Sequence, residues 1–210
     1  MVEYSSFADG SRGCIGGLPI SSHVVALAGP RGCGKSTIAQ HLVEQHGFER
    51  LAFSDVLREI AMLAGPERVN DRQYLSDLGQ VLRSYDPQFL LKAMQEKLNR
   101  GTKVVIEDIR FPQELDFSRE QGIFTVYLDL DETEQLQRIQ KREVCSIEVA
   151  RQLAAIADNH LLNRAASWDK IITSEGDFRN LASKIVSISS PARKRHHRND
   201  SDRNGSEFLC

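Results

Sequence analysis

Residues 29–37 read Gly-Pro-Arg-Gly-Cys-Gly-Lys-Ser-Thr, which matches the pattern G-x-x-x-x-G-K-[ST]. The apolar run 23–28 comes directly before this stretch, and a segment with helical spacing follows at 35–46. A strand, a glycine-rich turn and a helix in this order place several backbone N–H groups around phosphate oxygens. The stretch therefore predicts a nucleotide-binding loop within an α/β fold.

Each residue type in this loop has a chemical reason to be there. The glycines let the backbone curl so that its N–H groups point inward. The ammonium of Lys35 can reach the β- and γ-phosphates, and the hydroxyl of Ser36 can bind Mg²⁺. We therefore expect ATP and Mg²⁺ as cofactors. The predicted nucleotide-binding residues are Gly29, Arg31, Gly32, Cys33, Gly34, Lys35, Ser36 and Thr37.

The bulk composition indicates one ordinary globular domain. The chain has 210 residues, of which 40% are hydrophobic and 27% are charged, and its formal net charge is −2. This balance gives no reason to expect general affinity for nucleic acids or membranes. No apolar run approaches the ~20 residues that span a bilayer, and no secretory pattern opens the chain. The 4 cysteines lack C-x-x-C spacing, so no structural zinc site is expected. One cysteine lies in the phosphate loop and one is the last residue, so we expect reduced thiols in a cytoplasmic protein, with a disulfide framework as the weaker alternative.

Strand and helix segments alternate through the middle of the chain. Strands are expected at 23–28, 51–53, 103–108, 123–128 and 170–173. Helices are expected at 35–46, 56–64, 72–84, 87–99, 112–120, 132–143, 147–166 and 178–187. This alternation predicts a parallel sheet that is covered by helices on both faces, with ligands at the carboxyl ends of its strands. The predicted fold is an α/β P-loop NTPase fold with a five-stranded parallel sheet.

The two ends of the chain differ from its middle. Residues 1–20 are rich in Gly and Ser and have no apolar period, which is typical of a flexible segment. The end of the chain carries a basic run at 193–198, so residues 189–210 are interpreted as a disordered basic tail. The P-loop domain is therefore predicted at 21–188.

A second motif lies at 105–114, which reads Val-Ile-Glu-Asp-Ile-Arg-Phe-Pro-Gln-Glu. Asp108, at the carboxyl end of a strand, can hold Mg²⁺ through water, and Arg110 can reach an anionic acceptor beside the triphosphate. Ser36 and Asp108 are therefore the predicted metal-binding residues. The chain has no Asn-Lys-x-Asp segment to read guanine, and the order Glu107-Asp108 differs from the Asp-Glu that is typical of motor-type ATPases.

The stretch 105–114 resembles the Asp-x-Arg-Phe-Pro-x-Glu signature of phage-type deoxynucleoside monophosphate kinases. Residues 53–60 resemble the acceptor-site helix of that family, and 74–79 together with Arg83 resemble its next helix. The resemblance extends from about residue 23 to 187. It implies transfer of the γ-phosphoryl group of ATP to a nucleoside monophosphate. The acceptor-binding residues that it implies are Ser54, Asp55, Arg58, Arg83 and Arg110.

Phosphoryl transfer depends on positioning and on cations that stabilise the transferred group. The helix expected at 132–143 carries Arg138 and Arg142, which are four residues apart and so share a face. Few residues, near Cys145 and Ser146, separate this helix from the next, which predicts a short lid. The predicted catalytic residues are Lys35, Asp108, Arg110, Arg138 and Arg142.

Three functions remain open from the sequence. The first is a kinase that phosphorylates a (deoxy)nucleoside monophosphate. The second keeps the donor site but phosphorylates a hydroxyl, on dephospho-coenzyme A or on a modified base in DNA such as a hydroxymethyl pyrimidine, with Asp55 or Asp108 as base. The third is an ATPase or a nucleotide-dependent binding module. The expected partners are nucleotides, with DNA as an alternative acceptor and no membrane; the oligomeric state stays open, a dimer being one option.

Overall fold

The computed structural model describes residues 23–98, 103–158 and 165–190. Its centre is a parallel sheet of five strands in the order β2-β3-β1-β4-β5. The strands are β1 His23–Ala28, β2 Glu49–Leu51, β3 Lys103–Ile106, β4 Phe124–Asp129 and β5 Lys170–Thr173. Because β1 lies between β3 and β4, the strand order reverses beside the segment that enters the phosphate loop.

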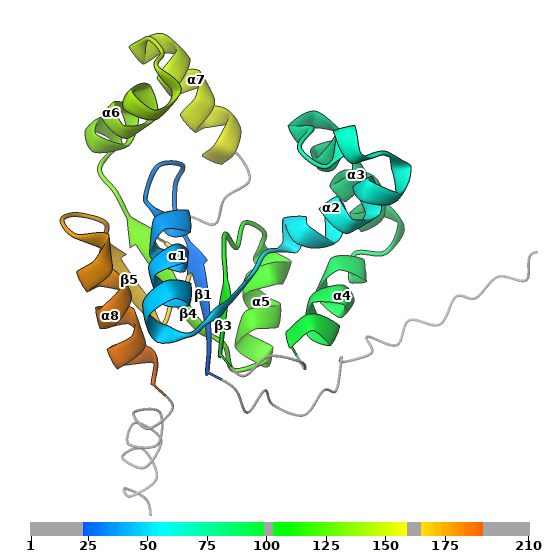
Figure 1. The fold of residues 1–210 in the computed structure, drawn as a ribbon, viewed down its shortest axis with the longest axis horizontal. Helices are drawn as coiled ribbons and strands as arrows, with labels where there is room; N and C mark the ends of the chain where they lie inside the picture. Colours follow the sequence, from blue (N-terminus) through cyan, green and yellow to red (C-terminus); the bar gives the residue numbers. More distant parts are fainter. Residues whose placement is uncertain (1–22, 99–102, 159–164, 191–210) are drawn as a thin grey trace, which may run out of the picture.

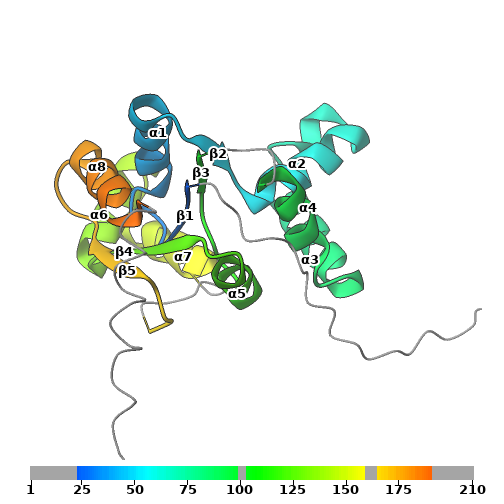
Figure 2. The ribbon, with the colours of Figure 1, turned by 90° about the horizontal axis from the view of Figure 1, so that it is seen from below.

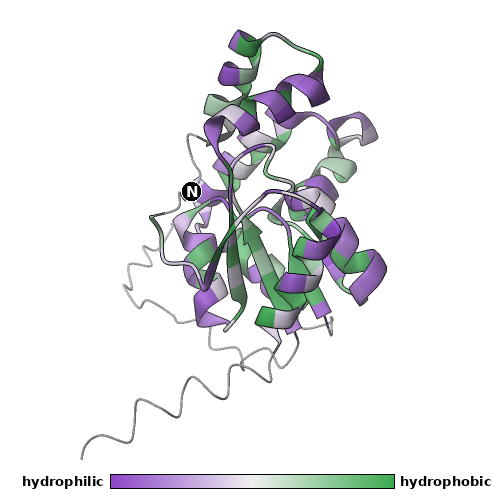
Figure 3. Cartoon of the chain, turned by 90° about the vertical axis from the view of Figure 1, so that its left-hand side faces the viewer, coloured by the Kyte–Doolittle hydropathy of each residue, from purple (hydrophilic) through white to green (hydrophobic). Residues whose placement is uncertain are grey.

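Helices cover both faces of the sheet, as the alternating pattern predicts (Figure 2). The helices are α1 Lys35–His46, α2 Phe53–Ala64, α3 Arg72–Tyr85, α4 Phe89–Leu98, α5 Pro112–Glu120, α6 Glu132–Glu143, α7 Ile147–Asp158 and α8 Phe178–Ser189, with a 3-10 turn at Pro66–Arg68. Val25 and Leu27 of β1 pack on the side of α1 and α8, whereas Val24 and Ala26 pack with α2, α4 and α5. The strand is therefore apolar throughout because both of its faces are buried, as the green strands inside purple-faced helices show in Figure 3.

Two helical units rise beyond the carboxyl end of the sheet (Figure 1). Helices α6 and α7 form one unit, directly above the loop between β1 and α1, and α2 and α3 form the other, to the right of that loop in the view of Figure 1. The first unit has its own small apolar cluster, which includes Leu136, Ile139 and Ala150. The phosphate loop is thus flanked on two sides by helices that belong to different parts of the chain.

The α/β P-loop fold and the five-stranded parallel sheet are confirmed, and one strand was misplaced. The expected strand 51–53 is wrong, because β2 ends at Leu51 and Phe53 already begins α2. Phe53, Val56 and Leu57 are all buried and share one helical face, so their spacing fits the helix better than a strand. Asp55 is consequently not the residue before the helix; it lies inside the first turn and accepts a hydrogen bond from the backbone of Ala52 at 2.8 Å.

Other boundaries move by one to three residues. Strand β3 ends at Ile106, so Glu107 and Asp108 follow the strand instead of closing it. The expected strand 123–128 begins one residue later, and α4 begins at Phe89 instead of Pro87. Helix α8 continues to Ser189, one residue past the predicted domain end.

Some predictions lie outside the described residues. These are the N-terminal segment 1–20, the tail beyond residue 190 and residues 159–164 of the helix expected at 147–166. The expected end of that helix is wrong, because Ala165 and Ala166 lie in a turn and a bend. In the ranges that the structure does describe, no helix combines the length and apolar character needed to cross a bilayer.

Candidate functional site: a phosphate loop beside an arginine cluster

Glycines shape the phosphate loop in the way the motif predicts. Gly29, Gly32 and Gly34 have φ angles of 140°, 86° and 86°, which residues with a side chain rarely adopt. A Cβ on Gly29 would lie 2.4 Å from the backbone oxygen of Leu128, and one on Gly34 would lie 2.5 Å from the ring of Phe178. The loop therefore requires glycine, and it leads directly into the N-terminus of α1, whose positive dipole end favours an anion.

Lys35 connects the loop with the end of β3. Its ammonium donates hydrogen bonds to the backbone oxygens of Gly29 at 2.6 Å and Pro30 at 3.0 Å. The same nitrogen lies 3.5 Å from a carboxylate oxygen of Asp108. The structure thus brings together Lys35 and Asp108, which were predicted from separate motifs. Thr37 lies exposed in the first turn of α1.

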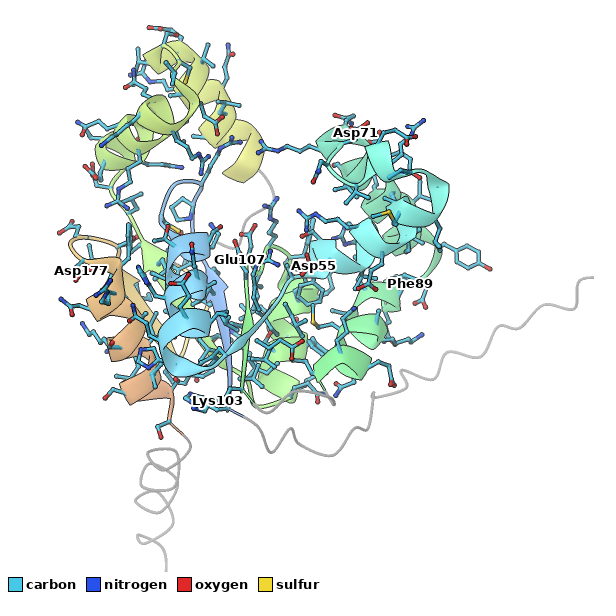
Figure 4. All side chains as sticks on the ribbon, in the orientation of Figure 1. Asp55, Asp71, Phe89, Lys103, Glu107 and Asp177 are labelled. Carbon is cyan, nitrogen blue, oxygen red and sulfur yellow. The ribbon has the colours of Figure 1, made fainter. Side chains whose placement is uncertain are left out.

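The carboxylate next to Ser36 is Glu107. The hydroxyl of Ser36 donates a hydrogen bond to one oxygen of Glu107, and Nε of Arg50 donates to the other at 2.5 Å. Arg50 also donates to Asp55 at 3.2 Å, so it joins the end of β3 to the start of α2. Figure 4 shows Glu107 and Asp55 near one another beyond the end of the sheet. The structure therefore adds Glu107 and Arg50 to the site, neither of which was assigned a role from the sequence.

The residues at this end of the sheet fit a nucleotide with its magnesium ion. The hydroxyl of Ser36 and the carboxylates of Glu107 and Asp108 supply hard oxygen atoms, which Mg²⁺ prefers. Within the described ranges, no three His, Cys, Asp or Glu side chains gather as a metal cage. The assignment of Mg²⁺ to Ser36 and Asp108 stays a prediction, and Glu107 is a further candidate because of its contact with Ser36.

Three predicted acceptor residues meet in the first turns of α2. Arg58 donates hydrogen bonds to the hydroxyl of Ser54 and to a carboxylate oxygen of Asp55, both at 2.8 Å. Because Asp55 also binds Arg50, its carboxylate lies between two guanidinium groups. The structure thus gathers the predicted set around one carboxylate.

Arg83 and Arg110 approach the same region from α3 and from the segment after β3. Arg110 binds the carboxylate of Asp108, with Nε at 2.7 Å. The guanidinium of Arg83 lies 4.2 Å from the ring centre of Phe111 and 3.7 Å from a carboxylate oxygen of Glu114. Burial lowers the pKa of Arg83, and the positive charge of Arg110 acts in the same direction, while Glu114 opposes both. Two cations therefore share a partly desolvated region, which is an arrangement that favours an anion.

Glu114 organises the segment between Asp108 and α5. It is 4% exposed, and one of its oxygens accepts backbone hydrogen bonds from Arg110 at 2.8 Å and Phe111 at 3.2 Å. Burial raises the pKa of Glu114 to about 7, against the opposing effects of those N–H groups and of Arg83. The sequence motif contains this residue, but its role was missed; the available signal was a Glu three residues after the residue that precedes a helix.

The two lid arginines occupy different surroundings. Arg138 donates to the backbone oxygen of Ser174 at 2.8 Å and to Glu134 at 2.8 Å, and its guanidinium lies 5.4 Å from the ring centre of Phe178. These contacts attach α6 to the loop after β5, where Ser174 in turn donates its hydroxyl hydrogen to the backbone oxygen of Cys33. Arg138 therefore lies where the phosphate loop meets the loop between β5 and α8.

Arg142 and Arg31 meet at Glu143. Arg31 of the phosphate loop donates to Glu143 at 2.8 Å, and Arg142 approaches the same oxygen at 3.0 Å. The hydrogen bond from Arg31 lowers the pKa of Glu143, and Arg142 adds to this effect. Residues 144–146 connect α6 to α7, so the predicted short connection between these helices is confirmed, and their action as a lid stays a prediction. The lid thus contacts the loop through a shared carboxylate.

Cys33 lies buried inside the loop, with its thiol sulfur 3.6 Å from the ammonium of Lys35. Burial raises the pKa of this thiol, and the nearby charge of Lys35 offsets only part of that effect. The thiol is therefore held in its protonated form and serves as a small packing group in the loop.

Comparison with known proteins points to the same class of fold and site. A family model described as an AAA domain (AAA_18) matches residues 25–155. The adenylate kinase of Mycoplasma mycoides subsp. mycoides is 28% identical over 130 residues, which are 59% of this chain and 60% of that protein. The cytidylate kinase of Natronomonas pharaonis is 28% identical over 129 residues, which are 60% of this chain and 62% of that protein. The match thus spans about three fifths of the length of these curated relatives.

A solved structure agrees at the level of the fold. The shikimate kinase of Acinetobacter baumannii has a TM-score of 0.50 and 21% sequence identity to this chain. The superposition covers 80% of this chain and 93% of that one. At this identity the likeness establishes the arrangement of sheet, loop and flanking helices.

Proposed function

Because the chain belongs to the AAA domain family and has a P-loop kinase fold, we propose that it transfers the γ-phosphoryl group of ATP to a nucleoside monophosphate. A deoxynucleotide is the expected acceptor, on the resemblance to phage-type kinases. The observation that carries the proposal is the pairing of two unlike sites at one end of the sheet. Lys35 of the phosphate loop lies near one carboxylate oxygen of Asp108, and Arg110 binds the other. Three further arginines, which belong to β2, α2 and α3, pair with Asp55 and Glu114.

On the donor side, the chain provides cations and N–H groups at fixed positions. Lys35 and the first turn of α1 would bind the β- and γ-phosphates. Mg²⁺, when bound, neutralises phosphate charge and orients the phosphate oxygens. Ser36, Glu107 and Asp108 are the residues that would hold it. Arg138 would act beside the nucleotide, because it joins α6 to the loop after β5.

On the acceptor side, four arginines are each paired with a carboxylate. The pairs are Arg50 with Glu107 and Asp55, Arg58 with Asp55, Arg83 with Glu114, and Arg110 with Asp108. A guanidinium presents a planar fork of donors that suits a phosphate group as well as a carboxylate. An acceptor phosphate can therefore bind among these arginines while the chain keeps them oriented.

The acceptor chemistry favours a monophosphate over a hydroxyl. A phosphate oxygen is already anionic and can attack in line without a strong general base. A hydroxyl acceptor would need a base, and the candidates Asp55 and Asp108 both have guanidinium partners in this structure. The arginine cluster thus supports the nucleotide kinase over the alternatives that require proton abstraction.

The proposal is tested by measuring ADP production from ATP and Mg²⁺ with each ribo- and deoxynucleoside monophosphate in turn. Strong stimulation by one or a few monophosphates is expected, and it would identify the base. Parallel reactions contain dephospho-coenzyme A or an oligonucleotide with hydroxymethyl pyrimidines. Stimulation by one of those alone would replace the proposal with a hydroxyl kinase. Acceptor-independent hydrolysis at full rate would replace it with an ATPase.

A further inference from the structure

A buried carboxylate lies behind the two arginines that approach from α3 and from the segment after β3. Glu114 is 4% exposed, so its side chain has given up most of its contact with water. Burial of a carboxylate is unfavourable unless hydrogen bonds or charges compensate for it. Here the compensation comes from the backbone N–H groups of Arg110 and Phe111 at 2.8 and 3.2 Å, and from Arg83 at 3.7 Å.

The guanidinium of Arg83 fits into a place that three residues define. Glu114 lies at one side of it, and the ring centre of Phe111 lies 4.2 Å from its Cζ. Gly79, one turn earlier on α3, lies at the third side, where a Cβ would come 2.9 Å from Nη1 of Arg83. The same Cβ would lie 3.2 Å from Cδ1 of Leu57, so a larger residue at 79 would require the Arg83 guanidinium and the Leu57 side chain to shift.

The backbone does not explain why residue 79 is a glycine. Gly79 lies inside α3 and is not among the residues with positive φ in the described chain. Glycine is less favourable than alanine in the interior of a helix, so the choice works against the stability of α3. The conformation of the helix does not require glycine at 79, but the position of the Arg83 side chain beside it does favour a residue without a Cβ.

We propose that Glu114 is a positioning residue for the acceptor site, holding the guanidinium of Arg83 and the backbone of Arg110 in place, and that Gly79 provides the room this requires. The inference rests on the proposed function, because it assumes that Arg83 and Arg110 bind the phosphate of the acceptor. Glu114 touches neither substrate; it keeps two like charges close together, which would otherwise move apart. It also links α3 to the segment after β3, so that arginines from both parts act on one anion.

The sharpest test is Gly79→Ala, because the substitution should weaken monophosphate binding without lowering the stability of the protein. Alanine should leave the thermal unfolding midpoint unchanged or raise it, since it favours the helix. It should also displace the Arg83 guanidinium and weaken monophosphate binding about tenfold, with ATP affinity changed less than about twofold. Ser76→Ala, at an exposed position of the same helix, is the matched control and should change neither affinity.

The second variant is Glu114→Gln, which keeps the shape and an oxygen for the backbone N–H groups but removes the charge that faces Arg83. The KM for the acceptor should rise about tenfold, while the KM for ATP stays within about twofold. The matched control is Glu120→Gln, which removes an exposed carboxylate from α5, the helix that carries Glu114. That control should leave both constants unchanged.

Monophosphate binding is measured by isothermal titration calorimetry with each deoxynucleoside monophosphate as probe and with the full chain. Weaker binding by both variants, with normal binding by both controls, supports the inference. If the wild-type protein binds a monophosphate and both variants bind it equally well, Glu114 and Gly79 have no positioning role, although the proposed function stands. If the wild-type protein binds none, the proposed function fails, and the positioning role fails with it.

Discussion

At the scale of single residues, substitution of Lys35 should reduce the rate of phosphoryl transfer much more than it reduces stability. In the proposed function the ammonium of Lys35 binds the β- and γ-phosphates of ATP, so Lys35→Ala should reduce phosphoryl transfer by about 10³-fold. The unfolding midpoint should change little. The rate is measured as ADP formation at saturating ATP and acceptor. Lys103→Ala is the control, because Lys103 lies at the opposite end of the sheet (Figure 4), and it should retain full activity.

Arg110 tests the division between donor and acceptor sides. Its guanidinium binds Asp108, and about half of its side chain is exposed. Arg110→Ala should raise the KM for the acceptor at least about tenfold through loss of a charge-assisted contact, with ATP binding nearly unchanged. Separate titrations with ATP and with the acceptor measure the two affinities. A collapse of ATP binding would show that the two sides are not divided as we propose.

Glu114 makes folding stability depend on pH in an unusual direction. Burial raises its pKa from the ordinary 4.5 to about 7 in the folded protein, so the folded state holds the proton more tightly. Its contribution to stability is therefore complete below about pH 4.5 and is lost as the pH rises through about 7. The loss for this group is on the order of 3 kcal/mol.

Comparison with Glu114→Gln isolates this contribution from those of the other acids. Urea unfolding of both proteins from pH 4.5 to 8 gives the difference in free energy of unfolding. We expect the wild-type advantage to shrink as the pH rises and to level off above about pH 8. A difference that stays constant with pH would mean that Glu114 has the same pKa in both states.

At the scale of helices and strands, the two lid arginines should behave differently. Arg138 is 23% exposed and joins α6 to Ser174, so Arg138→Ala should lower the free energy of unfolding by about 1 kcal/mol and weaken ATP binding. Arg142 is 54% exposed, so Arg142→Ala should change stability by less than about 0.5 kcal/mol. Its expected effect is on kcat, by about 10²-fold, if the lid brings it to the transferred phosphate.

Unfolding curves and steady-state kinetics of both variants test this contrast. Lys141→Ala, on the same helix, controls for the loss of a positive charge. Equal losses of stability in the two arginine variants would contradict the different surroundings that the structure gives them.

Elements with strong local signals could be predicted from the sequence, and weakly marked ones could not. The phosphate loop and α1 were predicted with correct boundaries because glycine positions and apolar spacing agree there. Strand β2 has three residues, of which two are exposed, so it has no apolar run to mark it. It was placed two residues too late, onto Phe53, which belongs to the apolar face of α2.

At the scale of the whole molecule, the missed site residues depend on the order of the strands. Arg50 reaches Glu107 because β2 is the neighbour of β3, and this pairing cannot be read from local sequence. Ser174 reaches Cys33 because the loop after β5 returns to the phosphate loop. Residues within one motif, such as Lys35 and Ser36, were predictable, whereas contacts between distant segments needed the topology.

The topology also places one carboxylate between the two halves of the site. Asp108 lies 3.5 Å from the ammonium of Lys35 and binds Nε of Arg110 at 2.7 Å. Its φ angle of 72° is rare for a residue other than glycine, so its backbone is held in a strained conformation at this junction. A ligand that changes the contacts of Lys35 should therefore change those of Arg110, and the donor and acceptor sites should be coupled.

This coupling is measurable as thermal stabilisation. A non-hydrolysable ATP analogue with Mg²⁺, at about 100 times its Kd, should stabilise the protein by about 2.7 kcal/mol, and EDTA should remove most of that gain. The analogue and the acceptor together should stabilise it by more than the sum of the separate effects, because each prepares the site of the other. Asp108→Asn should bring the combined effect back to the sum, since an amide cannot hold both cations. Simple additivity in the wild-type protein would show that the carboxylate shared by Lys35 and Arg110 transmits nothing between them.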